Sequence, residues 1–330
     1  MVMNSLEYYN ILAEIDNIPV ELWYFYRDIM NNYEFDKTRS INRAYFKMWE
    51  ILNNFNFFKK QVSNCNSHQY IRSCHIAEAP GSFILALYDY INFNEDISLI
   101  QAVALSKKPN KPSISGGHDG NPTFHKSVIH RNEFDLHYVD ILDNIERTNF
   151  NQAFKKNKFN FITADGGLDE GTNYATKETL HYKLLFTEVK MILQLQQHGG
   201  SCIIKFFESF NEKTLQIMYL LFKFYKRYTV YKPCTSRPSN SERYLICNDY
   251  LGFNNLPESI ENLDNVPETI KFELIAMNDK LVHEQCQVIK DIMNIIKNNV
   301  KINSNERLKI KNSSYTTWCN TFSFNDAMLK

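Results

Sequence analysis

Lys205 lies in an apolar segment, where a lysine could act as a base. It follows the apolar run 202–204 and precedes two phenylalanines, so its side chain is expected to be mostly buried. A buried lysine is costly unless it is paired or used, and burial beside another cation lowers its pKa toward the range of a general base. Structural pairing of Lys205 with an acid would explain the same run equally well.

Three further residues could join Lys205 in one cleft. Asp165 ends the apolar run 161–164, and the two glycines after it would let a substrate backbone come close. Glu242 lies in a polar loop that leads directly into a strand, and Lys47 lies in an apolar helical pattern, where a lone lysine is usually only solvated. Two lysines and two acids together could set the pKa of one lysine and hold a weakly acidic hydroxyl group against it.

The segment 75–83 has the pattern of a strand, a tight turn and the start of a helix. Free backbone N–H groups and the positive helix end face outward at such a turn, and Gly81 would allow a ligand to approach closely. Glu78 at the strand tip would repel a nucleotide phosphate but would suit the amino group of a zwitterion. The sequence therefore predicts S-adenosylmethionine as the ligand, although similar turns without a ligand are common in α/β proteins.

Strand-like and helical runs alternate from residue 70 to 250, which predicts a mainly parallel sheet with helices on both faces. The expected strands are 70–77, 98–105, 136–139, 160–164, 201–206, 229–232 and 244–247, and the expected helices are 83–91, 178–196 and 211–227. Ligands bind beyond the carboxyl ends of such strands. Glu78, Asp140, Asp165 and Lys205 would all lie at that edge.

Helical patterns flank this α/β segment and suggest three parts. They are an N-terminal helical segment, 1–60, which contributes Lys47, a central domain, 61–252, and a helical C-terminal extension, 253–330. The extension, with an apolar stripe over 268–300, is either an appendage or a partner-binding surface. The turn-rich loop 106–124 could be a lid, a substrate rim or a plain solvated loop.

Composition limits the kinds of partner. The 37 basic and 37 acidic residues leave no net charge, so contact with a nucleic acid needs a local patch, expected from Lys47, Lys107, Lys108, Lys111 and Arg237. Seven scattered cysteines suggest reduced thiols in the cytoplasm, and no metal is expected although Cys65, His68, Cys74 and His75 lie near one another. No leader is evident, and no run reaches the ~18 apolar residues of a membrane span.

Five motifs together resemble the FtsJ-like ribose 2′-O-methyltransferases. They are Arg43-Ala-Tyr-Phe-Lys47, Glu78-Ala-Pro-Gly-Ser-Phe83, Ala164-Asp-Gly-Gly167, Ile204-Lys205 and Ser236-Arg-Pro-Ser-Asn-Ser-Glu-Arg-Tyr244. Within this superfamily the chain is most similar to the mRNA cap-specific branch, which includes forms such as that of African swine fever virus. The resemblance covers roughly residues 40–250 in the correct order, and the last motif is the most specific.

The resemblance implies a Rossmann-like, doubly wound class I methyltransferase fold and a set of site residues. The catalytic residues would be Lys47, Asp165, Lys205 and Glu242, with Lys205 as the base. S-adenosylmethionine would be bound by Glu78, Ala79, Pro80, Gly81, Ser82, Phe83, Asp140 and Asp165. Substrate contacts would come from Arg43, Asn173, Tyr174, Phe207, Ser236, Arg237 and Asn240. One departure is Ser82, where the family commonly has a second glycine.

The function implied is methylation of the ribose 2′-OH of a cap-proximal nucleotide of mRNA. A ribosomal or transfer RNA ribose methyltransferase and an inactive scaffold of a capping or transcription complex remain alternatives. The expected partners are capped mRNA or another RNA and, through the C-terminal helices, capping or transcription machinery, without a membrane. The expected location is the cytoplasm, or the host cytoplasm or virion for a viral protein, with the nucleus also open.

Overall fold

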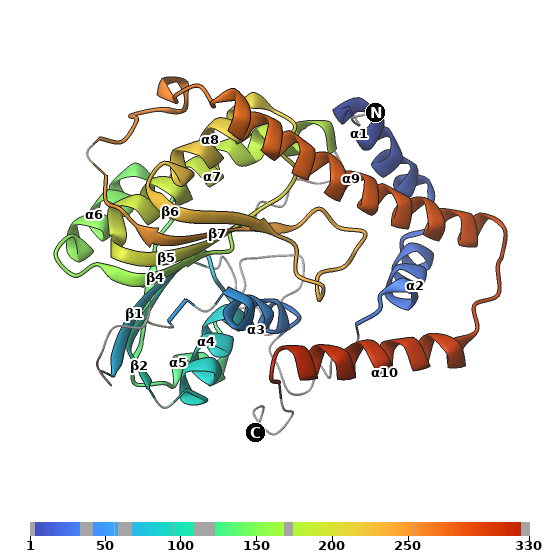
Figure 1. Ribbon diagram of the computed structural model, residues 1–330, viewed down its shortest axis with the longest axis horizontal. Coiled ribbons are helices and arrows are strands. Elements are labelled where there is room, and N and C mark those ends of the chain that lie inside the picture. The colour runs from blue at the N-terminus through green and yellow to red at the C-terminus, as the bar shows by residue number, and fades with distance from the viewer. Residues whose placement is uncertain are drawn as a thin grey trace.

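A seven-stranded sheet forms the centre of the protein (Figure 1). The computed structural model describes residues 4–33, 42–55, 57–58, 68–94, 96–108, 123–167, 174–253 and 255–324. The strands are β1 Gln69–Ile76, β2 Ile97–Ser106, β3 Phe134–Tyr138, β4 Phe159–Ala164, β5 Gln196–Phe206, β6 Tyr225–Tyr231 and β7 Arg243–Tyr250. Their order is β3-β2-β1-β4-β5-β7-β6. Only β7 runs antiparallel to its neighbours, which confirms the predicted mainly parallel sheet.

The strand order explains where a site can form. β1 pairs with β2 on one side and β4 on the other, so the chain turns in opposite directions from the centre of the sheet. A crevice opens beyond the carboxyl ends of the strands at such a point. β1, β3, β4 and β5 all end there, close to the four residues predicted for this edge.

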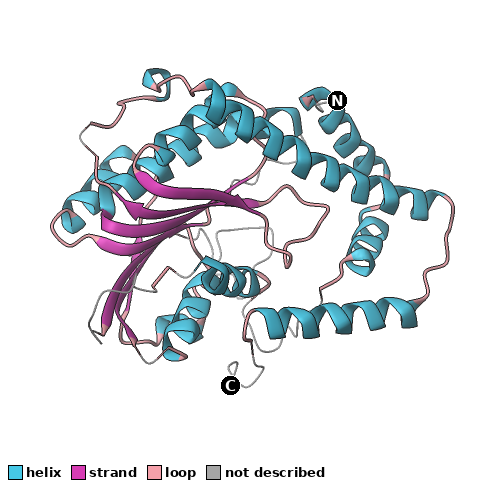
Figure 2. Ribbon diagram, viewed as in Figure 1, coloured by secondary structure: helices cyan, strands magenta, loops and turns pink. Residues whose placement is uncertain are grey.

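Helices cover both faces of the sheet (Figure 2). One face packs against α3 Ala44–Phe55, α4 Ser82–Asn92 and the short α5 Lys126–Ile129, and the other against α6 Asn144–Phe154, α7 Tyr174–Leu195 and α8 Glu212–Phe222. Successive side chains of a strand point to opposite faces, so Cys74 and Ile76 join one core while Ile71 joins the other.

Two helices differ from the sequence-based expectation. The helix expected over 211–227 ends at Phe222, because Tyr225 begins the edge strand β6. Helix α6 was not expected, since Phe150 is its only buried side chain and the apolar period is weak. Its start is nevertheless marked in the sequence by Asp143, whose carboxylate accepts from the backbone N–H groups of Ile145 and Glu146.

The two ends of the chain pack against each other. The remaining helices are α1 Ser5–Ala13, η1 Glu14–Asn17, α2 Val20–Met30, η2 Ile260–Asn262, α9 Glu268–Lys297 and α10 Ser304–Thr321. A separate apolar core joins Tyr8 and Trp23, from α1 and α2, to Val282 and Ile289 of α9. Figure 1 shows α9 running beside α1 and above α2.

The C-terminal helix α10 also reaches the central domain. Trp318 and Phe324 lie in the core that contains Tyr45 and Trp49 of α3, and the Trp49 indole donates to the backbone oxygen of Phe322 at 2.9 Å. The C-terminal extension is therefore built into the same packed structure as the helix that carries Lys47. No helix among the described residues is long and apolar enough to cross a membrane.

The residues weighed for a metal site have other surroundings. His75 is fully buried and its ring nitrogens lie 2.8 Å from the hydroxyl oxygens of Ser73 and Thr163. Cys74 is a free buried thiol, and Cys65 lies outside the described residues. Within the described ranges, no group of three or more His, Cys, Asp or Glu side chains is arranged to hold a metal ion.

Candidate active site

The four predicted catalytic side chains meet at the carboxyl edge of the sheet. Lys205 Nζ lies 3.1 Å from Asp165 Oδ1 and donates to the Asp165 backbone oxygen at 2.8 Å. Lys47 forms an ion pair with Glu242, and the Tyr244 hydroxyl donates to Glu242 at 2.8 Å. Each of the four charged side chains is at most 21% exposed. The result is a cluster of two adjacent ion pairs with limited access to water.

The local structure explains how distant residues meet. β4 ends at Ala164, so Asp165 leaves the sheet beside Lys205, which is the second-last residue of the neighbouring strand β5. The antiparallel register places Tyr244 opposite Lys205, and Glu242 just before β7. Lys47 reaches the cluster from α3, on one face of the sheet.

The electrostatics correct one expectation about Lys205. Burial lowers the pKa of Lys205, but the charges of Asp165 and Glu242 raise it. The raising effects together are larger, so the net result is a raised pKa. The predicted lowering is wrong for this state of the protein, because the carboxylates of Asp165, Glu242 and Glu188 together outweigh the effect of burial. Lys205 is thus an ammonium group here and must lose a proton before it can accept one.

The acids of the cluster are shifted in opposite directions. Burial raises the pKa of Glu242. The charges of Lys47 and Lys205 together outweigh burial and hold this pKa at about 2. The pKa of Asp165 is raised, chiefly by burial and against the opposing charge of Lys205. Glu242 is therefore ionised at neutral pH and supplies a permanent negative charge opposite Lys47 and Lys205.

A cavity of about 260 Å³ adjoins the cluster at the switch point of the sheet. Ala79, Asp140, Asp165 and the two glycines after Asp165 line it, together with the apolar side chains Leu105, Val139, Ile141, Leu142 and Leu184. Lys107 Nζ lies 2.9 Å from Asp140 and also lines the wall. Apolar walls with two carboxylates suit a ligand with an aromatic base and groups that donate hydrogen bonds.

The turn after β1 is held from inside by Glu78. This side chain is only 3% exposed, and its oxygens accept from the Phe83 N–H at 3.2 Å and from the Thr163 hydroxyl at 3.1 Å. Burial and the charge of Asp165 raise the pKa of Glu78 well above its ordinary value. Glu78 thus fixes the turn at the start of α4. Ser82 and Phe83 are buried as well.

Gly81 serves the packing of the turn. Its φ is +97°, and a Cβ there would lie 3.1 Å from Val128 Cγ2 and 3.2 Å from Phe124 Cδ1. The protein's own side chains fill the space into which a Cβ of Gly81 would project, and the approach of a ligand to the backbone of this turn stays a prediction. Pro80 precedes it in the same turn, and its backbone oxygen accepts from the His125 N–H at 3.0 Å.

Gly81→Ala is expected to destabilise the protein by about 2–4 kcal/mol, because the left-handed backbone and the contacts with Val128 and Phe124 both penalise a Cβ. The matched control is Gly199→Ala, since Gly199 has a φ of +76° and no atom within 4 Å of a built Cβ. This control should lose only about 1–2 kcal/mol. Urea denaturation of both variants measures the difference, and equal losses would show that crowding beside Gly81 contributes nothing.

The predicted substrate residues lie in different parts of the protein. Ser236, Asn240 and Arg43 shape the loop before β7: Ser236 donates to the Asn240 side chain at 3.2 Å, the Glu242 N–H donates to the same oxygen at 3.2 Å, and Arg43 donates to the Thr235 backbone oxygen at 3.4 Å. Phe207 is half-buried, with its ring centroid 5.9 Å from Lys205 Nζ. Asn173 and the side chain of Tyr174 lie outside what the structure describes.

The predicted basic patch is largely neutralised. Lys47 pairs with Glu242, Lys107 with Asp140, and Arg237 Nε lies 3.4 Å from Asp28 of α2. Lys108 is exposed, and Lys111 lies outside the described residues. Lys47 and Lys107 are therefore balanced by acids, whereas Arg237 shares Asp28 with Arg27, so the predicted patch keeps only part of its positive charge among the described residues.

Comparison with known proteins places this site in a family. Residues 40–250 match the model of the FtsJ-like methyltransferases, and this range contains all four members of the charged cluster. The chain belongs to the FtsJ-like methyltransferase family. The match excludes α1, α2, α9 and α10, which this methyltransferase adds to the shared domain.

Three relatives give the similarity in more detail. The chain is 24% identical to cap-specific mRNA (nucleoside-2′-O-)-methyltransferase 2 of Drosophila melanogaster, over 74% of this chain and 34% of that protein. It is 36% identical to the cap-specific mRNA (nucleoside-2′-O-)-methyltransferase of Autographa californica nuclear polyhedrosis virus, over 28% of this chain and 35% of that protein. A probable methyltransferase of African swine fever virus is 27% identical, over 62% of this chain and 48% of that protein. The matches span about a third to a half of these relatives.

Sequence reasoning missed Glu50, a fully buried acid on α3 of this FtsJ-like methyltransferase. Its carboxylate accepts from the Tyr231 hydroxyl, from the backbone N–H and hydroxyl of Thr235, and from the Trp318 indole at 3.1 Å, besides Cys234. Glu50 lies one helical turn from Lys47 and binds the loop that leads to Glu242. It thus fixes the two partners of one ion pair and joins them to α10.

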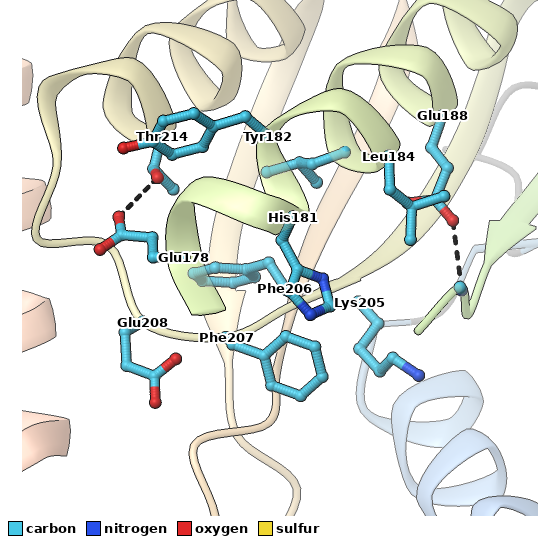
Figure 3. Close-up of a pocket in the computed structure, with 12 residues that line it drawn as sticks. Glu178, His181, Tyr182, Leu184, Glu188, Lys205, Phe206, Phe207, Glu208 and Thr214 are labelled. Carbon is cyan, nitrogen blue, oxygen red and sulfur yellow. Dashed lines mark hydrogen bonds between the residues drawn. The ribbon is translucent and has the colours of Figure 1, made fainter. Parts of the chain in front are cut away.

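A second missed acid, Glu188 of α7, holds the loop that contains Asp165 (Figure 3). Glu188 is 1% exposed and accepts from the Gly166 N–H at 3.2 Å, and a Cβ on Gly166 would lie 2.2 Å from its Oε1. Burial raises the pKa of Glu188 to about 8. Figure 3 shows it with Lys205, Phe207 and His181 around a cavity of about 20 Å³, room for about one water molecule. For Glu50 and Glu188 alike, the sequence indicates no special role beyond a position in an apolar helix.

Proposed function

We propose that this methyltransferase transfers a methyl group from S-adenosylmethionine to the ribose 2′-OH of a cap-proximal nucleotide of mRNA. The observation that carries the proposal is the cluster of Lys205, Asp165, Lys47 and Glu242 beside the cavity at the switch point. A ribose hydroxyl is a weak acid, so its attack on a methyl group needs a positioned base. Lysine paired with acids in a site with little water can be that base.

The cavity beside the cluster fits S-adenosylmethionine by its chemistry. Ile141, Leu142 and Leu184 offer apolar surface to the adenine, and the Asp140 and Asp165 carboxylates can accept from its amino or hydroxyl groups. When bound, the cofactor supplies a methyl group activated by a positively charged sulfur. Glu78 and Gly81 shape the turn at the cavity wall without lining the cavity themselves.

Each member of the cluster has a separate task. Lys205, once neutral, accepts the proton of the 2′-OH at Nζ, and Asp165 directs Nζ through its side-chain and backbone oxygens. Glu242 stays ionised and holds Lys47, which keeps a second positive charge next to the developing alkoxide. Phe207, beside Lys205, offers a ring on which a base of the RNA can stack.

The cap-proximal position is supported by the relatives from Drosophila and the nuclear polyhedrosis virus, which are named cap-specific mRNA methyltransferases. The polar loop from Ser236 to Glu242 carries the most specific of the sequence motifs and borders the cluster. An RNA end that enters between this loop and Phe207 would bring a terminal ribose to Lys205.

Transfer of a radiolabelled methyl group to RNA tests this function. Capped RNA should be labelled, uncapped RNA of the same sequence should be labelled much less, and the label should appear in an alkali-resistant fragment that still carries the cap, because a 2′-O-methyl group blocks alkaline cleavage. Capped RNA that already carries 2′-O-methyl groups on its first nucleotides is the matched control and should accept no label. Equal labelling of capped and uncapped RNA would support a ribosomal or transfer RNA substrate instead, and alkali-labile label would exclude ribose methylation.

A further inference from the structure

A basic groove lies between α6 and α7, outside the charged cluster. It has a volume of about 530 Å³, and Arg147, Lys155, Lys158, Lys190 and Phe253 line it together with uncharged amide and hydroxyl side chains. No carboxylate is among the described residues that line it. We call it the α6–α7 groove.

Among the residues that the structure describes, no acid lies within ion-pair distance of the four cations of the α6–α7 groove. None of the ion pairs between described residues includes any of them. Lys190 donates to the Glu258 backbone oxygen at 3.2 Å, and Lys158 Nζ lies 5.8 Å from the centre of the Phe253 ring. Burial and then the charge of Arg147 lower the pKa of Lys190, and the Glu258 carboxylate offsets only part of this. Like charges gathered without counter-charges favour an anionic ligand.

The position of the groove relates it to the proposed active site. Arg147, near the start of α6, donates to the Ile141 backbone oxygen at 2.6 Å, and Ile141 lines the cavity next to the cluster. Lys155 and Lys158 follow the end of α6, at the edge of the sheet where β4 begins. The 11 residues of α6 span roughly 16 Å. The cations thus extend from the wall of the cavity to the opposite edge of the sheet.

We propose that the α6–α7 groove binds the phosphodiester backbone of the RNA beyond the reacting nucleotide. This inference rests on RNA being the substrate of the proposed function. A row of cations along a helix fits successive phosphates better than one small anion, and Phe253 offers a stacking surface for a base. A protein without net charge needs such a local site, and Lys47 and Lys107 of the patch predicted from the sequence are paired with acids.

The double variant Lys155→Glu/Lys158→Glu tests the groove while it leaves the Arg147 contact with the cavity wall intact. Fluorescence anisotropy should show that binding of an uncapped 20-nucleotide RNA weakens by about tenfold or more at low salt, and that the slope of log K against log salt decreases in magnitude by about 1.4 for two lost phosphate contacts. Methyl transfer to a capped trinucleotide should stay unchanged. The control Lys226→Glu/Lys280→Glu makes the same charge change at exposed positions of β6 and α9 and should bind RNA like the unmodified protein.

Three results would overturn the proposal. They are unchanged affinity of the groove variant for the long RNA, an equal loss in the control variant, and displacement of the long RNA by inorganic phosphate with no dependence of affinity on RNA length, which would indicate a small-anion site. Failure of the proposed function is seen separately, because the unmodified protein would then transfer no methyl group to capped RNA of any length.

Discussion

Replacement of Lys205 by methionine is expected to lower the single-turnover rate of methyl transfer by about 10²–10⁴-fold, the usual contribution of a positioned general base. Affinity for S-adenosylmethionine, measured by calorimetry, should change little, because Lys205 points at the cluster and does not line the cavity of about 260 Å³. Methionine preserves the length of the side chain, so the fold of β5 should persist.

Two further variants separate a base from a positive charge. Lys205→Arg keeps the cation and can still pair with Asp165, but a guanidinium cannot lose its proton in this pH range. It should be about as inactive as Lys205→Met. Lys183→Met removes an exposed lysine from α7 and should leave the rate unchanged. An arginine variant with near-normal turnover would mean that Lys205 acts by its charge alone.

Replacement of Glu50 by alanine is expected to reduce the free energy of unfolding by about 3–5 kcal/mol, as for other buried charged groups whose partners are left behind. The change would strand the Tyr231 hydroxyl, the Thr235 and Cys234 N–H groups and the Trp318 indole, all of which donate to Glu50. Urea denaturation, monitored by circular dichroism, measures the change in the free energy of unfolding.

Matched variants show whether Glu50 also positions the active site. Trp318→Phe removes one of its donors and should cost about 1 kcal/mol. Glu284→Ala removes an exposed acid from α9 and should stay within about 0.5 kcal/mol of the unmodified protein. The Trp318 variant should also turn over more slowly while binding the cofactor normally, since α10 helps hold α3. A loss below about 1 kcal/mol in Glu50→Ala would contradict the role given to Glu50.

The strands and the charged cluster could be predicted because their signals are local. Each strand is an apolar run bounded by turn residues, and the order of the motifs brings Asp165 and Lys205 to one edge of a parallel sheet. Helix α6 was missed because only one of its side chains is buried. The sequence of α6 therefore has no clear apolar period.

Other features depend on distances between segments that the sequence does not contain. The raised pKa of Lys205 results from acids that lie 40 and 37 positions away in the chain, and the resemblance to a family indicates which residues meet but not the balance of their charges. Glu50 gains its importance from Tyr231 and Trp318, from two distant elements. The ion pairs of Lys47 and Lys107, two members of the predicted basic patch, likewise depend on acids from distant segments or loops.

The pH dependence of single-turnover methyl transfer tests the central claim most directly, when the unmodified protein is compared with Glu242→Gln. Lys205 must lose its proton to act, and its raised pKa means that the rate should increase about tenfold per pH unit below that pKa. Glu242→Gln removes a carboxylate that raises this pKa and leaves Lys47 without its counter-charge, so the midpoint of the profile should move to lower pH even if the maximal rate falls. A rate that is independent of pH, or a midpoint that stays in place in Glu242→Gln, would contradict Lys205 as the base.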